Sequence, residues 1–174
     1  MSGEFPATDK PQTGPTVQIR PARADDLPTL SSLTVRLAEF PIPMWRTGAQ
    51  VIDAERTAVT RALTAGSPDA PILVAEDTAG RVLGFAYLET HQDYFTGLFH
   101  AHVSILVVAG TAEGRGVGRA LLSAAEAWAR ERGDPFITLN VFAQNVRARA
   151  LYERLGYGAE TLRYVKPLDS ADAG

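Results

Sequence analysis

The sequence predicts a single α/β or α+β domain in which helices cover both faces of a mixed β-sheet. Three observations carry this prediction. The chain has 174 residues, which is enough for one domain with a sizeable core and short for two. Its apolar fraction of 45% and charged fraction of 21% are those of an ordinary globular protein. The predicted elements follow the order β-α-α-β-β-β-α-β-α-β, which is not the regular alternation of a Rossmann fold.

Both ends of the chain are predicted to lie outside this domain. Residues 1–16 are rich in Pro, Gly, Ser and Thr and contain almost no large apolar side chain. Such a segment cannot bury enough surface to offset the entropy of ordering. We expect a flexible segment over 1–16, the folded domain over 17–168 and a short flexible tail over 169–174.

The domain is predicted to begin with a strand and an amphipathic helix. Alternating side chains predict a strand over 17–20, which Pro21 ends. Asp25 is a candidate N-cap, and apolar side chains at helical spacing over 27–37 predict a helix.

The middle of the chain is predicted to contain a loop, a second helix and three strands. Segment 40–45 has two prolines and bulky apolar side chains, so it breaks the first helix and forms an exposed loop. The second helix is expected over 51–63. Apolar runs with intervening turns then predict strands at 72–76, 82–89 and 99–108.

The last third begins with a glycine-rich turn that leads directly into a helix. This helix starts at Val117, shows apolar side chains at helical spacing and ends at Gly133. We then expect a strand over 136–142, a helix over 145–156 and a final strand over 162–166.

Composition excludes several classes of function. A net charge of −3 gives no basic surface for nucleic acid. The chain has no cysteine, which excludes disulfides, thiolate metal sites and cysteine nucleophiles, and its three histidines lack metal-ligand spacing with carboxylates. No apolar run approaches the roughly 20 residues of a membrane span, and the N-terminus shows no hydrophobic signal segment. We therefore expect a cytoplasmic protein with no metal and neither a membrane nor a nucleic acid as its partner.

The most informative segment is the turn EGRGVGR at 113–119, between a strand and a helix. Glycines at alternate positions allow a tight turn and let a ligand approach the backbone. Free N–H groups and the positive end of the helix dipole point at such a turn, which makes it suitable for phosphate. Arg115 and Arg119 add positive charge. A purely structural strand-to-helix turn explains the same glycines equally well at this point.

Two common phosphate-binding motifs fit this turn poorly. A P-loop needs Gly-x4-Gly-Lys-Ser/Thr, and the turn has no such Lys-Ser/Thr pair. A dinucleotide fingerprint needs Gly-x-Gly-x-x-Gly in a first β-α unit. Here the third glycine comes one residue early, and the motif lies late in the chain.

The spacing instead resembles the coenzyme A loop of the GNAT superfamily of N-acetyltransferases, which is written Gln/Arg-x-x-Gly-x-Gly/Ala. Gly116 and Gly118 match its two glycines. Glu113 stands where the family usually has Gln or Arg. That departure affects a side-chain contact more than the phosphate site, which the family builds from backbone N–H groups.

A second segment, NVRARALYERLGY at 145–157, matches the GNAT signature Asn-x-x-Ala-x-x-x-Tyr-x-x-x-Gly-Phe/Tyr. Each motif residue also has a structural explanation: Asn145 as an N-cap, Gly156 as the left-handed C-terminal residue, and Tyr152 as a packed core side chain. The two motifs nevertheless occur in the order and at the separation typical of the family. The resemblance covers 17–168 in element order, with its specific motifs in 104–157.

The resemblance implies an acetyl-CoA-dependent N-acetyltransferase with a mostly antiparallel sheet. The strand that ends at Val108 is implied to splay from its neighbour and to bind the pantetheine arm, with the Val108 N–H as oxyanion donor. Tyr152 is implied to lie near the sulfur, where a phenol with an ordinary pKa of about 10 suits protonation of the departing thiolate. The residues expected to bind the coenzyme are Leu106, Val108, Gly114, Arg115, Gly116, Val117, Gly118, Arg119 and Asn145.

The general base is the least defined part of the expected site. Many relatives carry Glu or Asp on the strand before the loop, whereas segment 100–105 has no carboxylate. His102 is the first candidate because a neutral imidazole can take an ammonium proton near pH 7. Glu89 on the neighbouring strand is the second, acting through water. A half-buried His102 that is only hydrogen-bonded to its neighbours is equally open.

The acceptor pocket is implied to form from the first two helices, their loop and the turn between the middle strands. The residues concerned are Phe40, Met44, Trp45, Tyr94, Phe95 and Phe99. This apolar surface with few acids favours an amino-acid-like, peptide or aromatic amine over a polycationic acceptor, although core packing or a homodimer contact would explain it too. The alternative functions are a non-catalytic acyl-CoA-binding module of the same fold, used for sensing, and a transferase for longer acyl-CoA.

Overall fold

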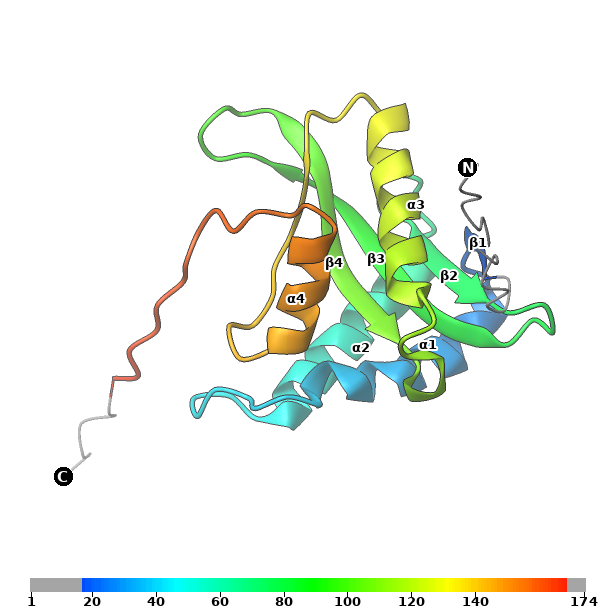
Figure 1. Cartoon of the computed structure of the whole chain (residues 1–174), viewed down its shortest axis with the longest axis horizontal. Helices are drawn as coiled ribbons and strands as arrows, with labels where there is room; N and C mark the ends of the chain where they lie inside the picture. Colours follow the sequence, from blue (N-terminus) through cyan, green and yellow to red (C-terminus); the bar gives the residue numbers. More distant parts are fainter. Residues whose placement is uncertain (1–16, 169–174) are drawn as a thin grey trace, which may run out of the picture.

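The computed structural model describes residues 17–168, which form one five-stranded sheet and four α-helices (Figure 1). The segments expected to be flexible, 1–16 and 169–174, lie outside the described residues. The strands are β1 (Gln18–Pro21), β2 (Ile72–Glu76), β3 (Val82–Gln92), β4 (Phe99–Val108) and β5 (Ile137–Leu139). The helices are α1 (Leu27–Leu33), α2 (Gly48–Ala65), α3 (Val117–Glu131) and α4 (Val146–Arg154), with short 3₁₀ helices η1 (Ala24–Asp26), η2 (Thr34–Ala38) and η3 (Gly110–Ala112).

The strands lie in the order β1-β2-β3-β4-β5. The first three pairings are antiparallel, and only β4 and β5 are parallel. This confirms the predicted mixed and mostly antiparallel sheet.

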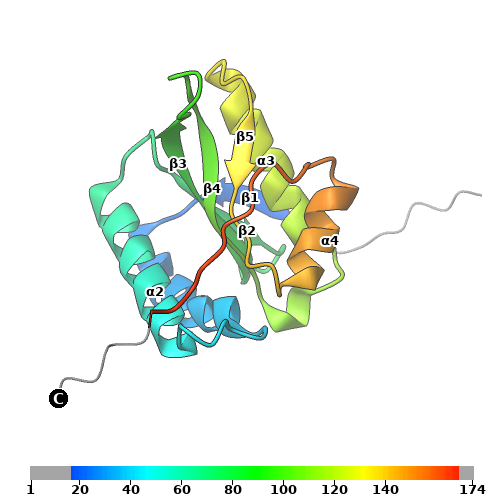
Figure 2. The same ribbon diagram turned by 90° about the vertical axis from the view of Figure 1, so that its left-hand side faces the viewer.

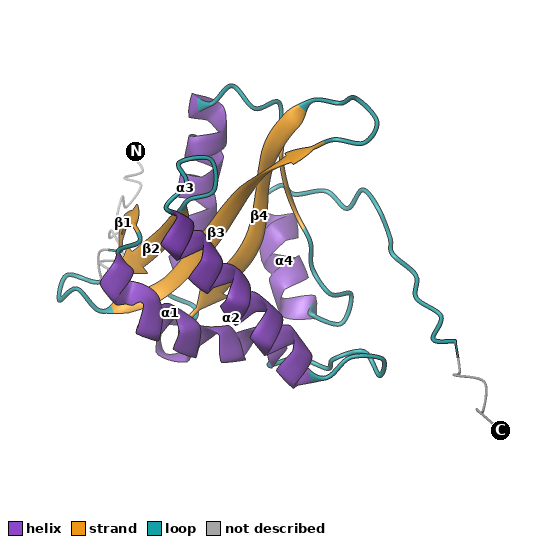
Figure 3. Ribbon diagram, turned by 180° about the vertical axis from the view of Figure 1, so that it is seen from behind, coloured by secondary structure: helices purple, strands orange, loops and turns teal. Residues whose placement is uncertain are grey.

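Helices cover both faces of the sheet, also as predicted. Figure 2 shows α2 on one side and α3 and α4 on the other, and Figure 3 shows α1 and α2 together on their face. Each face has its own buried cluster because side chains alternate along a strand. Leu30 and Val59 pack with Phe85 on the α2 face, and Leu121 packs with Leu88 on the α3 face.

The N-terminal helix differs from its prediction. Asp25 is not the N-cap, since η1 precedes α1 and the N-cap position belongs to Asp26. The carboxylate of Asp26 accepts the Arg23 N–H at 2.7 Å. The expected helix over 27–37 also changes to 3₁₀ geometry at Thr34, whose hydroxyl donates to the Ser31 carbonyl at 2.8 Å, a local bond that suits the tighter turn.

The boundaries of α2 follow from its capping residues. The Thr47 hydroxyl accepts the Gln50 N–H at 3.1 Å, and the Gln50 side chain accepts the Thr47 N–H at 2.8 Å. This capping box lets the helix begin three residues before the predicted start. Gly66, in the left-handed region with φ of 59°, ends it.

The C-terminal part of the sheet is smaller than predicted. β5 spans three residues rather than 136–142, and the expected strand over 162–166 does not form. A strand needs a partner to satisfy its backbone, and β5 pairs with β4 only over Ala101–Val103. Residues 159–168 are exposed and join no strand of the described chain.

Two irregularities of β4 create an opening in the sheet. Tyr87 pairs with Ile105 and Leu88 with Val103, so Ser104 is the extra residue of a β-bulge. Pairing with β5 stops at Val103, and the chain after β5 turns away toward α4 (Figure 2). From Ser104 to Val108 one edge of β4 therefore has no strand beside it.

Candidate functional site

A cavity of about 810 Å³ follows this free edge of β4. Its walls come from β4, the turn before α3, α4 with the segment that precedes it, and, at the other end, η2 and α2. Because the cavity passes the edge of the sheet, a ligand on the α3 side can meet a second molecule that enters from the α2 side.

The turn before α3 has the backbone geometry of a phosphate site. Gly114 and Gly116 have φ of 71° and 78°, which favours glycine. The first backbone bond of the helix runs from the Ala120 N–H to the Gly116 carbonyl at 2.9 Å. The preceding amides, including those of Val117 and Gly118, have no carbonyl of their own helix to bind. Both residues line the cavity, so the turn fits a phosphate group.

Gly118 sets how closely the elements pack at this end of the cavity. A Cβ atom at this position would lie 3.2 Å from Leu151 Cδ2 and 3.6 Å from Val108 Cγ2. The glycine therefore lets α3 approach both α4 and β4 closely.

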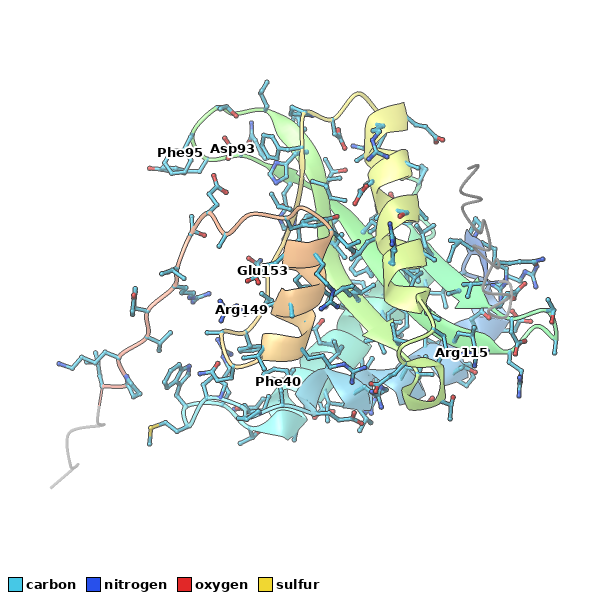
Figure 4. All side chains as sticks on the ribbon, in the orientation of Figure 1. Phe40, Asp93, Phe95, Arg115, Arg149 and Glu153 are labelled. Carbon is cyan, nitrogen blue, oxygen red and sulfur yellow. The ribbon has the colours of Figure 1, made fainter. Side chains whose placement is uncertain are left out.

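The structure separates the two arginines of the turn. Arg119 lines the cavity. Arg115 is exposed and lies outside the lining, and its side chain points away from α4 (Figure 4). Its Nη1 lies 3.5 Å from the Thr111 carbonyl oxygen. Of the two, only Arg119 is placed to meet a ligand in the cavity.

Glu113 has a structural role that its departure from the motif did not reveal. Its carboxylate accepts from Arg147 Nη1 at 2.5 Å and from Arg36. The Arg147 hydrogen bond and charge, with the charge of Arg36, lower the pKa of Glu113. Arg36 also donates from Nε to the Val108 carbonyl at 2.7 Å. Glu113 thus ties the turn to η2, β4 and α4.

The free edge of β4 presents backbone donors to the cavity. The Ala109 N–H donates to the Leu83 carbonyl of β3 at 2.7 Å. Amide directions alternate along a strand, so the N–H groups of Val108 and Leu106 point to the edge that β5 has left. The Val108 carbonyl, bound by Arg36, points the same way.

Residues of the second motif line the opposite wall. Asn145 caps α4, its Oδ1 accepting the Ala148 N–H at 3.2 Å, and it lines the cavity with Tyr152. Burial raises the pKa of Tyr152 to about 12. The phenol therefore carries its proton at neutral pH.

His102 is buried beside the cavity instead of lining it. Its Nδ1 lies 2.8 Å from Thr138 Oγ1 and its Nε2 3.4 Å from Asn140 Nδ2, while the ring stacks on His91 at 4.2 Å between centroids. Burial and the neighbouring histidines lower the pKa of His102 to about 4, against the opposing charge of Glu89. Such an imidazole stays neutral and is a weak base at pH 7.

Glu89 lies next to His102 in the register of β3 and β4. The Tyr87 hydroxyl donates to Glu89 Oε1 at 3.0 Å, and the Ser104 hydroxyl donates to Oε2. Ser104 lines the cavity, whereas Glu89 lies outside the lining. Ser104 was not predicted as a site residue, because apolar side chains precede and follow it in β4 and no local signal marks the bulge.

The structure brings only one of the six predicted acceptor-pocket residues to the lining of the cavity. Phe40 lines it and lies 5.1 Å from Phe142 between ring centroids. Trp45 is half-exposed outside the lining, and Tyr94 is 92% exposed on the β3–β4 hairpin, where its ring lies 5.4 Å from that of Phe95 between centroids. Glu55 of α2 lines the acceptor half, where burial and then the charge of Glu89 raise its pKa.

Two kinds of feature are absent from residues 17–168. No group of three or more His, Cys, Asp or Glu side chains there is arranged to hold a metal ion. No helix of the described part is long and apolar enough to cross a membrane.

Comparison with known proteins agrees with this geometry. A family model described as the acetyltransferase (GNAT) family matches residues 35–157. A mycothiol acetyltransferase from Salinispora tropica is 40% identical over 89 residues, which cover 51% of this chain and 29% of that protein. An aminoglycoside N(6')-acetyltransferase type 1 from Stenotrophomonas maltophilia is 35% identical over 89 residues, covering 49% of this chain and 58% of that protein.

The fold is similar to that of a putative acetyl transferase from Pyrococcus furiosus, with a TM-score of 0.68 and 25% identity, covering 88% of this chain and 100% of that chain. The chain spans less than a third of the mycothiol acetyltransferases it matches.

Proposed function

The chain belongs to the GNAT family of acetyltransferases, whose acetyl donor is acetyl-CoA, and we propose that it acetylates a primary amine of a small molecule or peptide by direct attack. One observation carries the proposal: a phosphate-ready turn opens onto a cavity that follows the free edge of β4 to Tyr152. Acetyl-CoA supplies the thioester when it is bound.

The coenzyme half of the cavity suits this donor. The amides at the start of α3, together with Arg119, would hold the pyrophosphate, and Asn145 would contact the coenzyme from the opposite wall. The backbone of Leu106, on the free edge of β4, would bind the pantetheine arm, which leaves the Val108 N–H for the thioester. Holding the thioester in this way provides much of the rate through orientation.

Two groups are placed to act on the thioester. The Val108 N–H would donate to its oxygen, as a fixed dipole that needs no reorganisation. The Tyr152 hydroxyl would donate to the departing sulfur, since it remains protonated across the physiological range.

The geometry favours Glu89 over His102 as the base. Both ring nitrogens of His102 are occupied by polar neighbours, and its pKa of about 4 makes it a poor acceptor of an ammonium proton. Glu89 is fixed by two hydroxyl donors and connects to the cavity through Ser104.

The acceptor would enter from the α2 side, between Phe40 and Glu55. The relatives named above are called a mycothiol acetyltransferase and an aminoglycoside N(6')-acetyltransferase, and these names support a small-molecule amine. An acidic side chain in this half of the cavity suits an acceptor that arrives as an ammonium ion.

The test is isothermal titration with acetyl-CoA and CoA, followed by thiol release over phenethylamine, an amino-acid amide, a dipeptide and an aminoglycoside. We expect micromolar binding of acetyl-CoA and thiol release with at least one amine. Binding without thiol release from any amine would favour a non-catalytic acyl-CoA-binding module. Failure to bind acetyl-CoA would overturn the proposal.

A further inference from the structure

Ser104 occupies a special position on β4. It is the extra residue of the β-bulge, and it is the first residue after pairing with β5 stops. It lines the cavity within the free-edge segment 104–108. A regular strand would turn alternate side chains to fixed faces, whereas a bulge re-aims one of them.

The Ser104 hydroxyl connects the cavity to Glu89. It donates to Glu89 Oε2, while the Tyr87 hydroxyl holds Oε1 at 3.0 Å. Burial and the Glu89 hydrogen bond raise the pKa of Tyr87 to about 12, so Tyr87 remains a donor. Ser104 therefore stands between the reacting groups and the second carboxylate oxygen.

From this arrangement we infer that Ser104 is a catalytic residue of the acetyl transfer, placed to contact the acceptor amine and relay its proton to Glu89. The inference rests on the proposed function. The ammonium N–H bond breaks as its proton moves to Ser104 Oγ, and the Ser104 O–H bond breaks as that proton moves to Glu89 Oε2. The amine is left neutral with its lone pair free, Ser104 is regenerated as a hydroxyl, and Glu89 becomes a carboxylic acid.

The relay explains two features that a direct base would leave without a purpose. The bulge brings a hydroxyl, rather than an apolar side chain, to the point where β4 and β5 separate. The Tyr87 hydroxyl orients Glu89 through Oε1. The other oxygen, Oε2, accepts from the Ser104 hydroxyl, which lines the cavity. A fixed acceptor of this kind loses little free energy to reorganisation when the proton arrives.

The test is Ser104→Ala, assayed with the best amine of the thiol-release panel. We expect kcat to fall by about 10- to 100-fold, below the full range for acid–base catalysis because water can partly replace the hydroxyl. The Kd for acetyl-CoA should stay within twofold. The defect should be largest at low pH and shrink as the pH approaches the pKa of the amine, where less of the amine needs deprotonation.

The pH dependence is taken as the ratio of wild-type to variant kcat/KM. The titratable groups that face Glu89 are Tyr87 and His91 on β3, His102 on β4 and Glu55 on α2. They are present in both proteins, so their direct titration largely cancels in the ratio.

Two variants separate chemistry from structure. Ser104→Thr keeps the hydroxyl and should restore kcat to within about fivefold of wild type. Ser123→Ala makes the same change at an exposed position of α3 and should leave kcat unchanged. Thermal unfolding confirms that each variant is folded.

Equal kcat in Ser104→Ala, a defect that does not change with pH, or no rescue by Thr would overturn the relay alone. A wild-type protein that binds acetyl-CoA but releases thiol with none of the amines would overturn the proposed function and the relay together.

Discussion

Tyr152 illustrates how surroundings select one role for a side chain. Burial raises its pKa to about 12, so in the proposed reaction it would act as a hydrogen-bond donor and not as a base near pH 7. Tyr152→Phe removes the donor while keeping the ring. We expect kcat to fall by about 10- to 100-fold, with the Kd for acetyl-CoA unchanged within twofold, as measured by steady-state kinetics and titration.

Tyr157→Phe is the matched control. Tyr157 donates to Glu126 Oε1 at 3.3 Å and lies outside the lining of the active cavity. It should keep wild-type kcat. Equal turnover in Tyr152→Phe would remove the acid role of Tyr152.

Glu113 places a negative charge beside the turn that we propose to bind phosphate. Arg147 compensates that charge through a 2.5 Å hydrogen bond. We expect Arg147→Ala to raise the Kd for CoA about three- to tenfold at low salt, because the partly uncompensated carboxylate repels the phosphates. The double variant Arg147→Ala/Glu113→Gln should regain most of the affinity for CoA. Titration of CoA into the single and the double variant measures this.

Arg149→Ala, on the same helix, removes a charge that contacts the Ala143 carbonyl instead of Glu113, and serves as the control. A double variant that binds as weakly as Arg147→Ala would show that Arg147 contacts the phosphates itself.

At the scale of elements, the two ends of α3 allow the effect of backbone strain on stability to be separated from its effect on CoA binding. Gly116 has φ of 78° at the start of the helix and Gly133 has φ of 76° after its end. An alanine at either position should cost about 1–2 kcal/mol of stability because it must adopt the left-handed region. Only Gly116→Ala should also weaken CoA binding, by at least fivefold, since it distorts the turn that presents the amides.

Urea unfolding and titration of CoA measure the two effects. Equal loss of CoA affinity in Gly116→Ala and Gly133→Ala would mean that affinity follows global stability, and that the turn holds no phosphate.

Elements with strong local signals were predicted well from the sequence. β2 and β4 have their predicted bounds, and the N-cap Asn145 marks the start of α4. The errors concern strands whose formation or length depends on pairing with a strand that is distant in the sequence. Segment 162–166 has suitable side chains but pairs with no strand of the described chain, and β5 ends after Leu139 because the chain that follows it turns away from β4.

The coenzyme side of the candidate site was predictable for a related reason. Its residues lie within two continuous segments, 106–119 and 145–152, whose spacing is visible in one dimension. The acceptor side was harder to predict. Ser104, Glu55 and Asn140 lie far apart in the sequence and come together only when the chain folds. The bulge at Ser104 depends on the register between β3 and β4, which the side-chain pattern does not encode.

At the scale of the whole molecule, the two helical layers divide the work of the site. The α3 face carries the glycine-rich turn and Tyr152, and the α2 face carries Phe40 and Glu55. The sheet lies between the two layers, and the cavity along the free edge of β4 connects them. The opening therefore depends on β4 remaining paired with β3, and so on the stability of the sheet as a whole.

The opposite edge of the sheet is held by a buried ionic network whose strength depends on pH. Arg20 on β1 donates to both carboxylate oxygens of Asp26, at 2.7 and 2.9 Å, and to Glu76 of β2 at 2.6 Å. The Arg20 hydrogen bonds lower the pKa of Asp26. A carboxyl whose folded pKa lies below its unfolded value of about 3.9 stabilises the fold above that value, and the contribution is lost as the pH falls through the folded pKa.

We therefore expect Asp26→Asn to lower the free energy of unfolding by about 2 kcal/mol at pH 7, because it leaves a largely buried Arg20 with one partner fewer. The difference from wild type should shrink as the pH falls below 4, where the wild-type carboxyl also becomes protonated. Urea unfolding at pH 7, 5, 4 and 3 measures it, with the exposed neighbour Asp25→Asn as control. A difference that stays constant from pH 7 to pH 3 would mean that Asp26 stabilises the fold by packing and neutral hydrogen bonds, and that its charge contributes nothing.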